Sequence, residues 1–168
     1  ELSVLTHKEP SEETKQLVKF TTQVAKHQDA HGCLFSAENP ATSGLSTLAA
    51  WEAVFGKYQE RHSTDWTYFR SEACQLGMIA ESVGSKEAPP LRKAQWWLAN
   101  WDLGAMNLRC RDPRALTGTS HDHRWVQGKC KNRLGATADV SAVSGEYTPE
   151  QATVYAWSLA KALVEVRR

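Results

Sequence analysis

A strand expected just before Glu38-Asn39-Pro40 constrains the fold of this chain more than any other feature. Ser11 is a good N-cap for a helix that runs to about residue 28, and the polar turn at 29–32 breaks that helix. Residues 33–35 are an apolar run and indicate a short buried strand that ends at Ser36. A helix, a turn and a strand in this order are expected of an α/β fold, in which ligands bind at the carboxyl edge of the strands.

Local signals predict further elements along the chain. Residues 45–55 favour a helix, and the aromatic run 66–69 favours a second strand. Residues 93–99 favour a third strand over a tryptophan-rich helical turn. The segment Thr148-Pro149-Glu150-Gln151 combines an N-cap, a proline at the first helical position and a glutamine at the third. This capping box predicts a C-terminal helix.

These elements predict one α/β domain over residues 1–168, with a small, mostly parallel (Rossmann-like) sheet and flanking helices. A helix-strand-helix-strand core is expected at 10–105, and a C-terminal helix at 147–168. The segment between them, 106–146, shows little hydrophobic periodicity. It is therefore expected to be rich in loops.

Composition narrows the function classes. The formal net charge is +1, which argues against a strongly basic nucleic-acid binder or a polyacidic tail. Two local basic clusters remain candidate binding patches, although such clusters are more often solvated loops. They are Arg109, Arg111 and Arg114, and Lys129, Lys131 and Arg133.

The cysteines and the apolar runs bear on the compartment. The four cysteines are far apart and show no dense disulfide framework, which favours a reducing, intracellular compartment. No apolar run approaches the roughly 20 residues of a membrane span. Cys33 and Cys74 have apolar neighbours in the sequence, so inert packing is expected of both.

Glu38 and Asn39 are the first candidate site. A carboxylate at a strand end can accept a hydrogen bond from an amine or a base N–H, or donate a proton if its pKa is raised. The alternative is structural. Glu38 and Asn39 would then cap the following helix, and Pro40 would end the strand.

The second candidate site is a zinc site formed by Cys110, His121, His123 and Cys130. A Cys₂His₂ set is a common closed structural site, and a metal contributes most to folding where a segment lacks a core of its own. His121 and His123 are only two positions apart, so they can ligate one ion together only in extended backbone. Otherwise both are hydrogen-bonded loop residues.

A nuclease-like reading rests on the same histidines. The pattern His121-Asp122-His123 followed by Gly128, Cys130 and Asn132 resembles that of metal-dependent recombination endonucleases. That family usually adds two Cys-x-x-Cys knuckles, and this sequence has neither.

A broader resemblance spans about residues 12 to 165. Its features are Glu38-Asn39-Pro40, Trp51, an acid-x-Cys-x-x-Gly segment (Glu72, Cys74, Gly77), Lys93 with Asn100, His121 with His123 and Gly128, and Tyr147-x-Pro149. In this order they resemble the methyltransferase-like domain of retroelement-type polyproteins of dinoflagellates and related protists. The chain is more distantly similar to the second half of cytosine-5 DNA methyltransferases.

The resemblance implies roles for two residues. Glu38 would hold a target base, and Asn39 would shape the pocket. The family's glycine-rich S-adenosylmethionine loop and its Pro-Cys nucleophile segment are absent and would lie upstream of Glu1. The resemblance thus implies S-adenosylmethionine only if an upstream or partner half exists.

Three functions follow as hypotheses. The first is a non-catalytic methyltransferase-like remnant that serves as a structural or interaction module, with nucleic acid or other protein subunits as partners. The second is a methyltransferase fragment that needs a partner for its cofactor half. The third is a zinc-dependent nucleic-acid-binding or nuclease-like module centred on residues 110–130.

Overall fold

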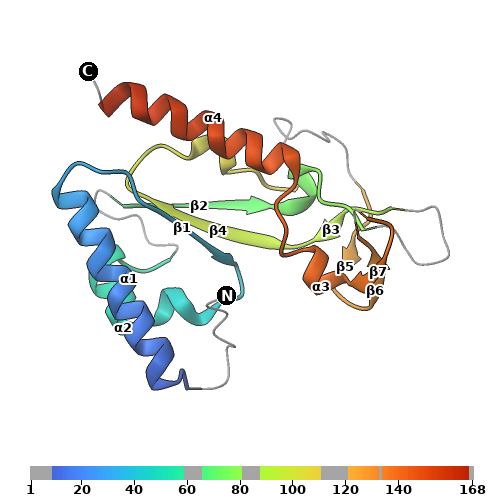
Figure 1. Cartoon of the computed structure of the whole chain (residues 1–168), viewed down its shortest axis with the longest axis horizontal. Coiled ribbons are helices and arrows are strands. Elements are labelled where there is room, and N and C mark those ends of the chain that lie inside the picture. Colours follow the sequence, from blue (N-terminus) through green and yellow to red (C-terminus); the bar gives the residue numbers. More distant parts are fainter. Residues whose placement is uncertain (1–8, 59–65, 81–87, 111–120, 133, 167–168) are drawn as a thin grey trace.

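A three-stranded sheet with the order β1-β4-β2 forms the centre of the fold (Figure 1). The structure is a computed structural model that describes residues 9–58, 66–80, 88–110, 121–132 and 134–166. The strands are β1 (Ser36–Pro40), β4 (Ala94–Ala99) and β2 (Thr67–Glu72). Pro40 ends an edge strand, where its missing N–H leaves no ladder bond unmade.

The prediction of a mostly parallel, Rossmann-like sheet is wrong. Both pairs in the central sheet are antiparallel, β1 with β4 and β2 with β4. Strands β1 and β2 therefore run in the same direction, as a strand-helix-strand unit requires. Strand β4, however, lies between them and runs the opposite way. The one parallel pair in the described part of the chain is short, β3 (Leu91–Arg92) with β5 (Arg124–Trp125).

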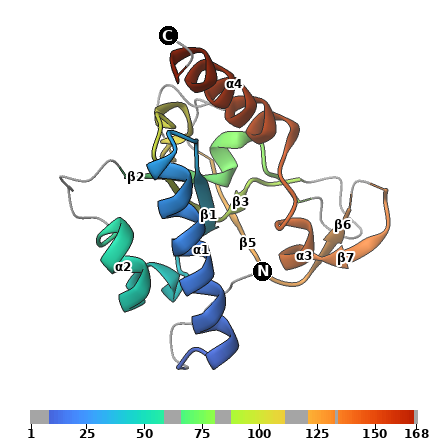
Figure 2. The ribbon, with the colours of Figure 1, turned by 60° about the vertical axis from the view of Figure 1, so that its left-hand side comes forward.

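Helices cover both faces of the central sheet. Helices α1 (Glu12–Ala30) and α2 (Ala49–Phe55) lie on one face, and α4 (Pro149–Val166) lies on the other (Figures 1 and 2). Because successive strand residues point to opposite faces, Trp96 packs in the cluster with α1 and α2, whereas Trp97 packs in the cluster under α4. Both indoles are buried.

Local capping signals account for the ends of the long helices. The Ser11 side chain accepts a hydrogen bond from the backbone N–H of Thr14, which confirms the predicted N-cap. Thr148 Oγ1 accepts from the backbone N–H of Gln151 at 3.0 Å. The side chain of Gln151 does not complete a capping box, because its Nε2 donates to Gln95 Oε1 on β4 at 2.9 Å.

Beyond the central sheet, short elements form a separate small core. The elements that contribute to it include η2 (Ala73–Leu76), β6 (Lys129–Lys131) and α3 (Val140–Val143). Strand β7 (Thr137–Asp139) pairs with β6 in antiparallel fashion. Two further 3₁₀ turns are η1 (Gly44–Thr47) and η3 (Gly104–Met106). The segment predicted to be loop-rich thus contains short strands that lie at one end of the molecule (Figure 1). Within the described residues, no helix is long and apolar enough to cross a membrane.

Candidate metal centre

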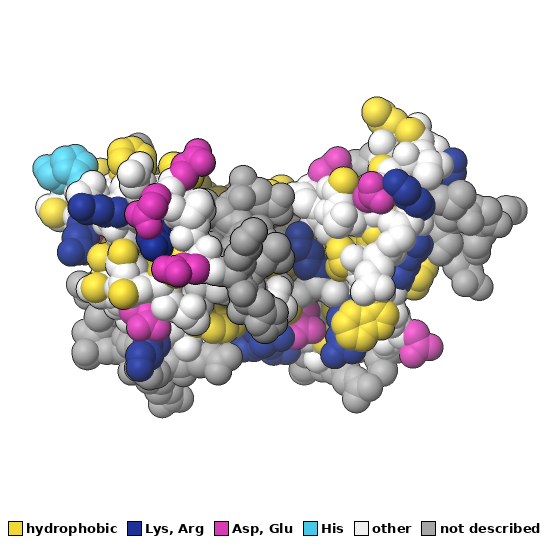
Figure 3. All heavy atoms as spheres, turned by 90° about the horizontal axis from the view of Figure 1, so that it is seen from below, with side chains coloured by type: hydrophobic (Ala, Val, Ile, Leu, Met, Phe, Trp, Pro, Cys, Tyr) yellow, Lys and Arg dark blue, Asp and Glu magenta, His cyan; other side chains and the backbone are white. Residues whose placement is uncertain are grey.

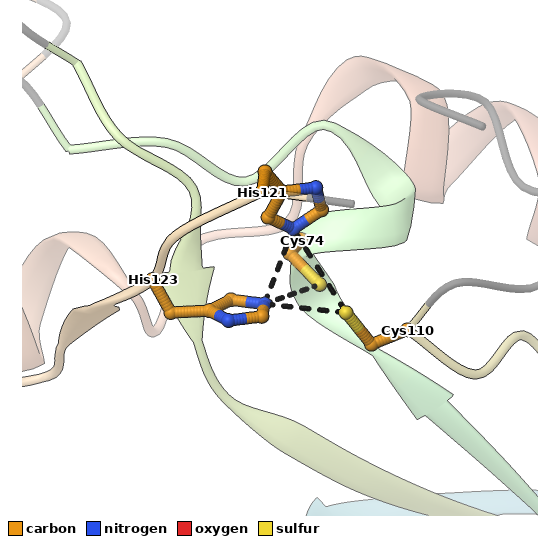
Figure 4. Close-up of side chains that lie close together, drawn as sticks. All are labelled: Cys74, Cys110, His121 and His123. Atoms are coloured by element: carbon orange, nitrogen blue, oxygen red, sulfur yellow. Dashed lines mark hydrogen bonds between the residues drawn. The ribbon is translucent and has the colours of Figure 1, made fainter. Parts of the chain in front are cut away.

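Four side chains from three separate parts of the chain converge on one point (Figure 4). Cys74, Cys110, His121 and His123 each offer one ligand atom, and these four atoms all lie within 4.8 Å of one another. Cys74 is buried, and the other three are half-buried. Two thiols and two imidazoles are a donor set that can hold a metal ion.

The separations within this group match those around one tetrahedral ion. Zinc–sulfur bonds of about 2.3 Å and zinc–nitrogen bonds of about 2.0–2.1 Å separate two nitrogens by about 3.3 Å, and a nitrogen from a sulfur by about 3.5 Å. The Nε2 atoms of His121 and His123 are 3.1 Å apart. His123 Nε2 lies 3.5 Å from Cys110 Sγ and 3.3 Å from Cys74 Sγ, and His121 Nε2 lies 4.0 Å from Cys110 Sγ.

The end of β2 positions the two cysteines. Cys74 lies in η2, directly after β2, and Gly77 ends this turn with φ of 76°, a conformation that favours glycine. The segment that leads to Cys110 runs beside the end of β2, because Glu72 donates its backbone N–H to the carbonyl of Leu108 at 2.8 Å. This contact brings the two thiols together although they are distant in the sequence.

The pairing of β3 with β5 positions the two histidines. His121 and His123 immediately precede β5, and the backbone N–H of Arg124 donates to the carbonyl of Pro90 at 2.9 Å. Both histidines point their Nε2 atoms at the thiols (Figure 4). In extended backbone, side chains two positions apart point to the same side. His121 and His123 lie where the chain enters β5, and both can therefore face one ion.

Burial disfavours charge at this centre. Burial raises the pKa of the Cys74 thiol to about 11, and a hydrogen bond from Gln75 Nε2 at 3.4 Å opposes this rise. Burial also lowers the pKa of His123, and the neighbouring His121 and Arg92 add to this effect. A divalent cation reverses the preference at the thiol, because it binds the thiolate and releases the proton.

Three of the four predicted metal ligands are in the group, namely Cys110, His121 and His123. The structure places Cys130 elsewhere, fully buried on β6 among apolar side chains such as Leu91 and Val140. Its position is taken by Cys74, for which inert packing was expected. The acid-x-Cys-x-x-Gly spacing was the one sequence signal for Cys74, since Gly77 allows the tight turn that exposes the thiol to the histidines.

The structure separates the other two candidate residues, Glu38 and Asn39. Glu38 pairs with Trp97 and Asn39 with Trp96, and side chains of directly paired residues share a face. Glu38 therefore lies on the α4 face and Asn39 on the α1 and α2 face. Both lie inside β1 and not after it, so they do not cap a following helix. The N-cap of η1 is Ser43, and the N-cap of α2 is Leu48.

Glu38 belongs to a hydrogen-bonded network on the α4 face. Its Oε1 accepts from Gln95 Nε2 at 2.8 Å, and its Oε2 accepts from the hydroxyl of Tyr147 at 3.3 Å. Gln95 in turn accepts from Gln151 at 2.9 Å. The sequence signalled the carboxylate but not the glutamines, because their contacts join distant segments.

Comparisons with known proteins add no relative. No family model matches the chain, and neither a curated protein nor a solved structure matches it.

Proposed function

We propose that this chain is a zinc-stabilised module that binds single-stranded nucleic acid. The observation that carries the proposal is the convergence of Cys74, Cys110, His121 and His123 beside an exposed basic and aromatic surface. The methyltransferase-like hypotheses are not part of it, because they implied a Rossmann-like sheet and the central sheet is antiparallel.

The donor set supports zinc in a structural role. Two sulfurs and two nitrogens in tetrahedral arrangement are typical of zinc among the common divalent ions. All four positions are filled by protein, whereas a catalytic or nuclease-like site keeps a position for water or substrate. The ion therefore joins η2, the segment before Cys110 and the entrance to β5, and it stabilises the end of the molecule that holds the short strands.

The surface proposed for nucleic acid includes Trp125, two residues after His123. Trp125 is 58% exposed, and the guanidinium carbon of Arg92 lies 4.5 Å from the centroid of its ring. Exposed aromatic rings stack on the bases of single strands, and arginine adds both stacking and charge. The pairing of β3 with β5 places Arg92 beside Trp125, and the zinc site would hold the entrance to β5.

Three further cations lie on β5 and β6, namely Arg124, Lys129 and Lys131. The guanidinium of Arg124 donates to the carbonyls of Ala80 and Lys129, and the Lys129 ammonium is 2.8 Å from Asp139. Figure 3 shows lysine and arginine side chains, with acidic side chains among them, beside exposed hydrophobic atoms over this end of the molecule. Of the predicted basic clusters, Arg111, Arg114 and Arg133 lie outside the described residues. The modest formal charge of +1 is thus compatible with a local positive patch.

Binding of fluorescein-labelled oligo(dT) and oligo(U), followed by fluorescence anisotropy at several salt concentrations, tests this function. We expect Trp125→Ala to weaken binding by about tenfold, because stacking contributes about 1–3 kcal/mol per base. Arg92→Ala should also weaken binding and lower the salt dependence. The matched control is Trp157→Ala, which removes a tryptophan of similar exposure (62%) from α4.

Three results would contradict the proposal. One is the absence of binding to either oligonucleotide at low salt by the zinc-loaded chain. Another is equal weakening by Trp125→Ala and Trp157→Ala, which would indicate non-specific adsorption. A third is binding that survives Trp125→Ala and Arg92→Ala unchanged, since it would place the contact elsewhere.

A further inference from the structure

A cavity of about 330 Å³ lies on the α4 face of the central sheet, and none of the four residues of the metal centre lines it. We call it the acidic aromatic cavity. Its main lining residues are Ser36, Glu38, Trp97, Tyr147, Gln151 and Tyr155. The volume falls within the range of small-molecule sites. Strand β1, strand β4 and the start of α4 build the cavity, so its walls belong to the most regular part of the fold.

Aromatic rings form much of the lining. Trp97 is buried, and the rings of Tyr147 and Tyr155 contact it with centroid separations of 5.9 and 5.5 Å. The faces of such rings carry partial negative charge and attract cations. A fourth ring, that of Trp101, contacts Tyr155 edge-on at 5.7 Å and supports it from outside the lining.

Glu38 gives the cavity its charge. It is the one charged side chain among the described lining residues, which include no lysine, arginine or histidine. Burial, followed by the nearby Glu38 carboxylate, raises the pKa of Tyr147 to about 12, so its hydroxyl stays protonated and donates to that carboxylate. An anion would meet both the carboxylate and the aromatic faces, and the lining therefore disfavours it.

A relay of buried amides fixes the orientation of the polar atoms. An ionised carboxylate can only accept, so Gln95 must turn its Nε2 to Glu38 and its Oε1 to Gln151. Gln151 must then donate through Nε2, which leaves its buried Oε1 without a protein partner. The hydroxyls of Ser36 and Tyr155 share a hydrogen bond at 2.7 Å. The polar groups of the lining thus mostly bond to one another, and the cavity offers the negative charge of Glu38 beside aromatic faces.

We propose that the acidic aromatic cavity binds a methylated ammonium group. Such a cation is weakly hydrated and gains from aromatic faces and from a carboxylate at close range without needing hydrogen-bond partners. Either a free quaternary amine or a methylated lysine side chain of a peptide could supply the group. The inference is independent of nucleic-acid binding, because the cavity and Trp125 lie on different elements.

The test is an NMR titration of the zinc-loaded chain that follows the Trp97 indole N–H and the Gln95 and Gln151 side-chain amides. The probes are choline chloride, its neutral isostere 3,3-dimethyl-1-butanol, sodium chloride for ionic strength, and a trimethyllysine peptide beside its unmethylated form. We expect saturable shifts of these signals with choline or the methylated peptide, and affinity about tenfold lower for the isostere. Whichever probe binds more tightly identifies the source of the group.

Variants sharpen the result. Glu38→Gln keeps the shape and removes the charge. Tyr147→Leu keeps the charge of Glu38 but removes a ring, together with the hydroxyl that donates to this carboxylate. Each should lower the affinity for choline about tenfold, whereas Glu165→Gln, the same change of charge outside the cavity, should leave it unaltered. Equal affinity for choline and its neutral isostere would overturn the proposal. The absence of saturable shifts with both cationic probes would also overturn it, and this measurement needs only the wild-type protein.

Discussion

The Nε2 atoms of His121 and His123 lie 3.1 Å apart, a separation suited to two ligands of one ion. Two neutral imidazoles at this distance could share only one proton between the two nitrogens. The Sγ atoms of Cys74 and Cys110 lie 3.3 and 3.5 Å from His123 Nε2. One metal ion can bind all four of these atoms together.

Metal content and thermal melting test this site. We expect about one zinc per chain, and a chelator should lower stability by about 3 kcal/mol or more, because metal binding is coupled to folding. For a chain of this size that corresponds to a fall in Tm of roughly 6–12 °C. His123→Ala and Cys74→Ala should each abolish stoichiometric zinc.

Two other cysteines provide the controls. Cys33→Ala, at an exposed thiol, should change neither zinc content nor Tm. Cys130→Ala should keep zinc while it costs about 1 kcal/mol of packing, since its side chain is buried among apolar groups. Loss of zinc in Cys130→Ala but not in Cys74→Ala would restore the ligand set that the sequence favoured.

A second prediction concerns Asn100, which ties the end of α1 to the sheet. Its Oδ1 accepts from the backbone N–H of Phe35 at 2.8 Å, and its Nδ2 donates to Asp29 Oδ1 at 3.1 Å and to the carbonyl of Cys33 at 3.0 Å. Asn100→Ala leaves these groups without their partner. We expect a loss of about 2–3 kcal/mol in urea unfolding at constant m-value. Asn107→Ala is the comparison, because Asn107 Oδ1 accepts from the backbone N–H of Arg70 at the longer distance of 3.3 Å. An equal loss of stability in this variant would contradict the role assigned to Asn100.

Glu38 gives a third prediction, because its role differs from that of a helix cap. Glu38→Ala removes the acceptor of Gln95 Nε2, and Gln95 is only 1% exposed. The unpaired buried amide should cost about 1–3 kcal/mol in chemical unfolding. Glu38→Gln retains an acceptor oxygen and should cost less. Equal stability of wild type and Glu38→Ala would mean that water replaces the carboxylate.

Local signals in the sequence predicted several individual elements, although the first strand begins at Ser36 and not at residue 33. Ser11 and Thr148 cap α1 and α4 through hydrogen bonds to residues three positions further on, so the local sequence is enough to predict these caps. The strands β2 and β4 likewise follow from their aromatic and apolar runs. The antiparallel pairing of the strands could not be predicted in this way, because the insertion of β4 between β1 and β2 depends on contacts between distant segments.

In the candidate sites, too, the local sequence revealed some residues, whereas others depend on contacts between distant segments. His121 and His123 were visible as a pair, whereas the choice of Cys74 over Cys130 depends on how η2 folds against the segment before Cys110. Glu38 was visible as a polar residue near a strand end. Its separation from Asn39 follows from the alternation of side chains once the strand is known to extend to Pro40.

The pH dependence of stability gives a fourth prediction, centred on Tyr68. Burial raises the pKa of Tyr68 to about 12 from about 10, against the lowering effect of the hydrogen bond from Trp51 Nε1 at 2.7 Å. The hydroxyl also donates to the carbonyl of Gly56 at 3.4 Å. The native state therefore holds the proton more tightly than the unfolded chain does, and this contribution to stability is complete below about pH 10 and falls as the pH rises towards 12.

Urea unfolding at pH 8 and at pH 11 checks this prediction. Tyr68→Phe should be less stable than wild type at pH 8 by about 1–3 kcal/mol, because the buried Trp51 N–H loses its acceptor. Between the two pH values, however, the variant should lose less stability than wild type, since it lacks the titrating hydroxyl. Other alkaline titrations occur in both proteins and cancel in the difference. Parallel losses would mean that the pKa of Tyr68 is the same in the folded and unfolded chain.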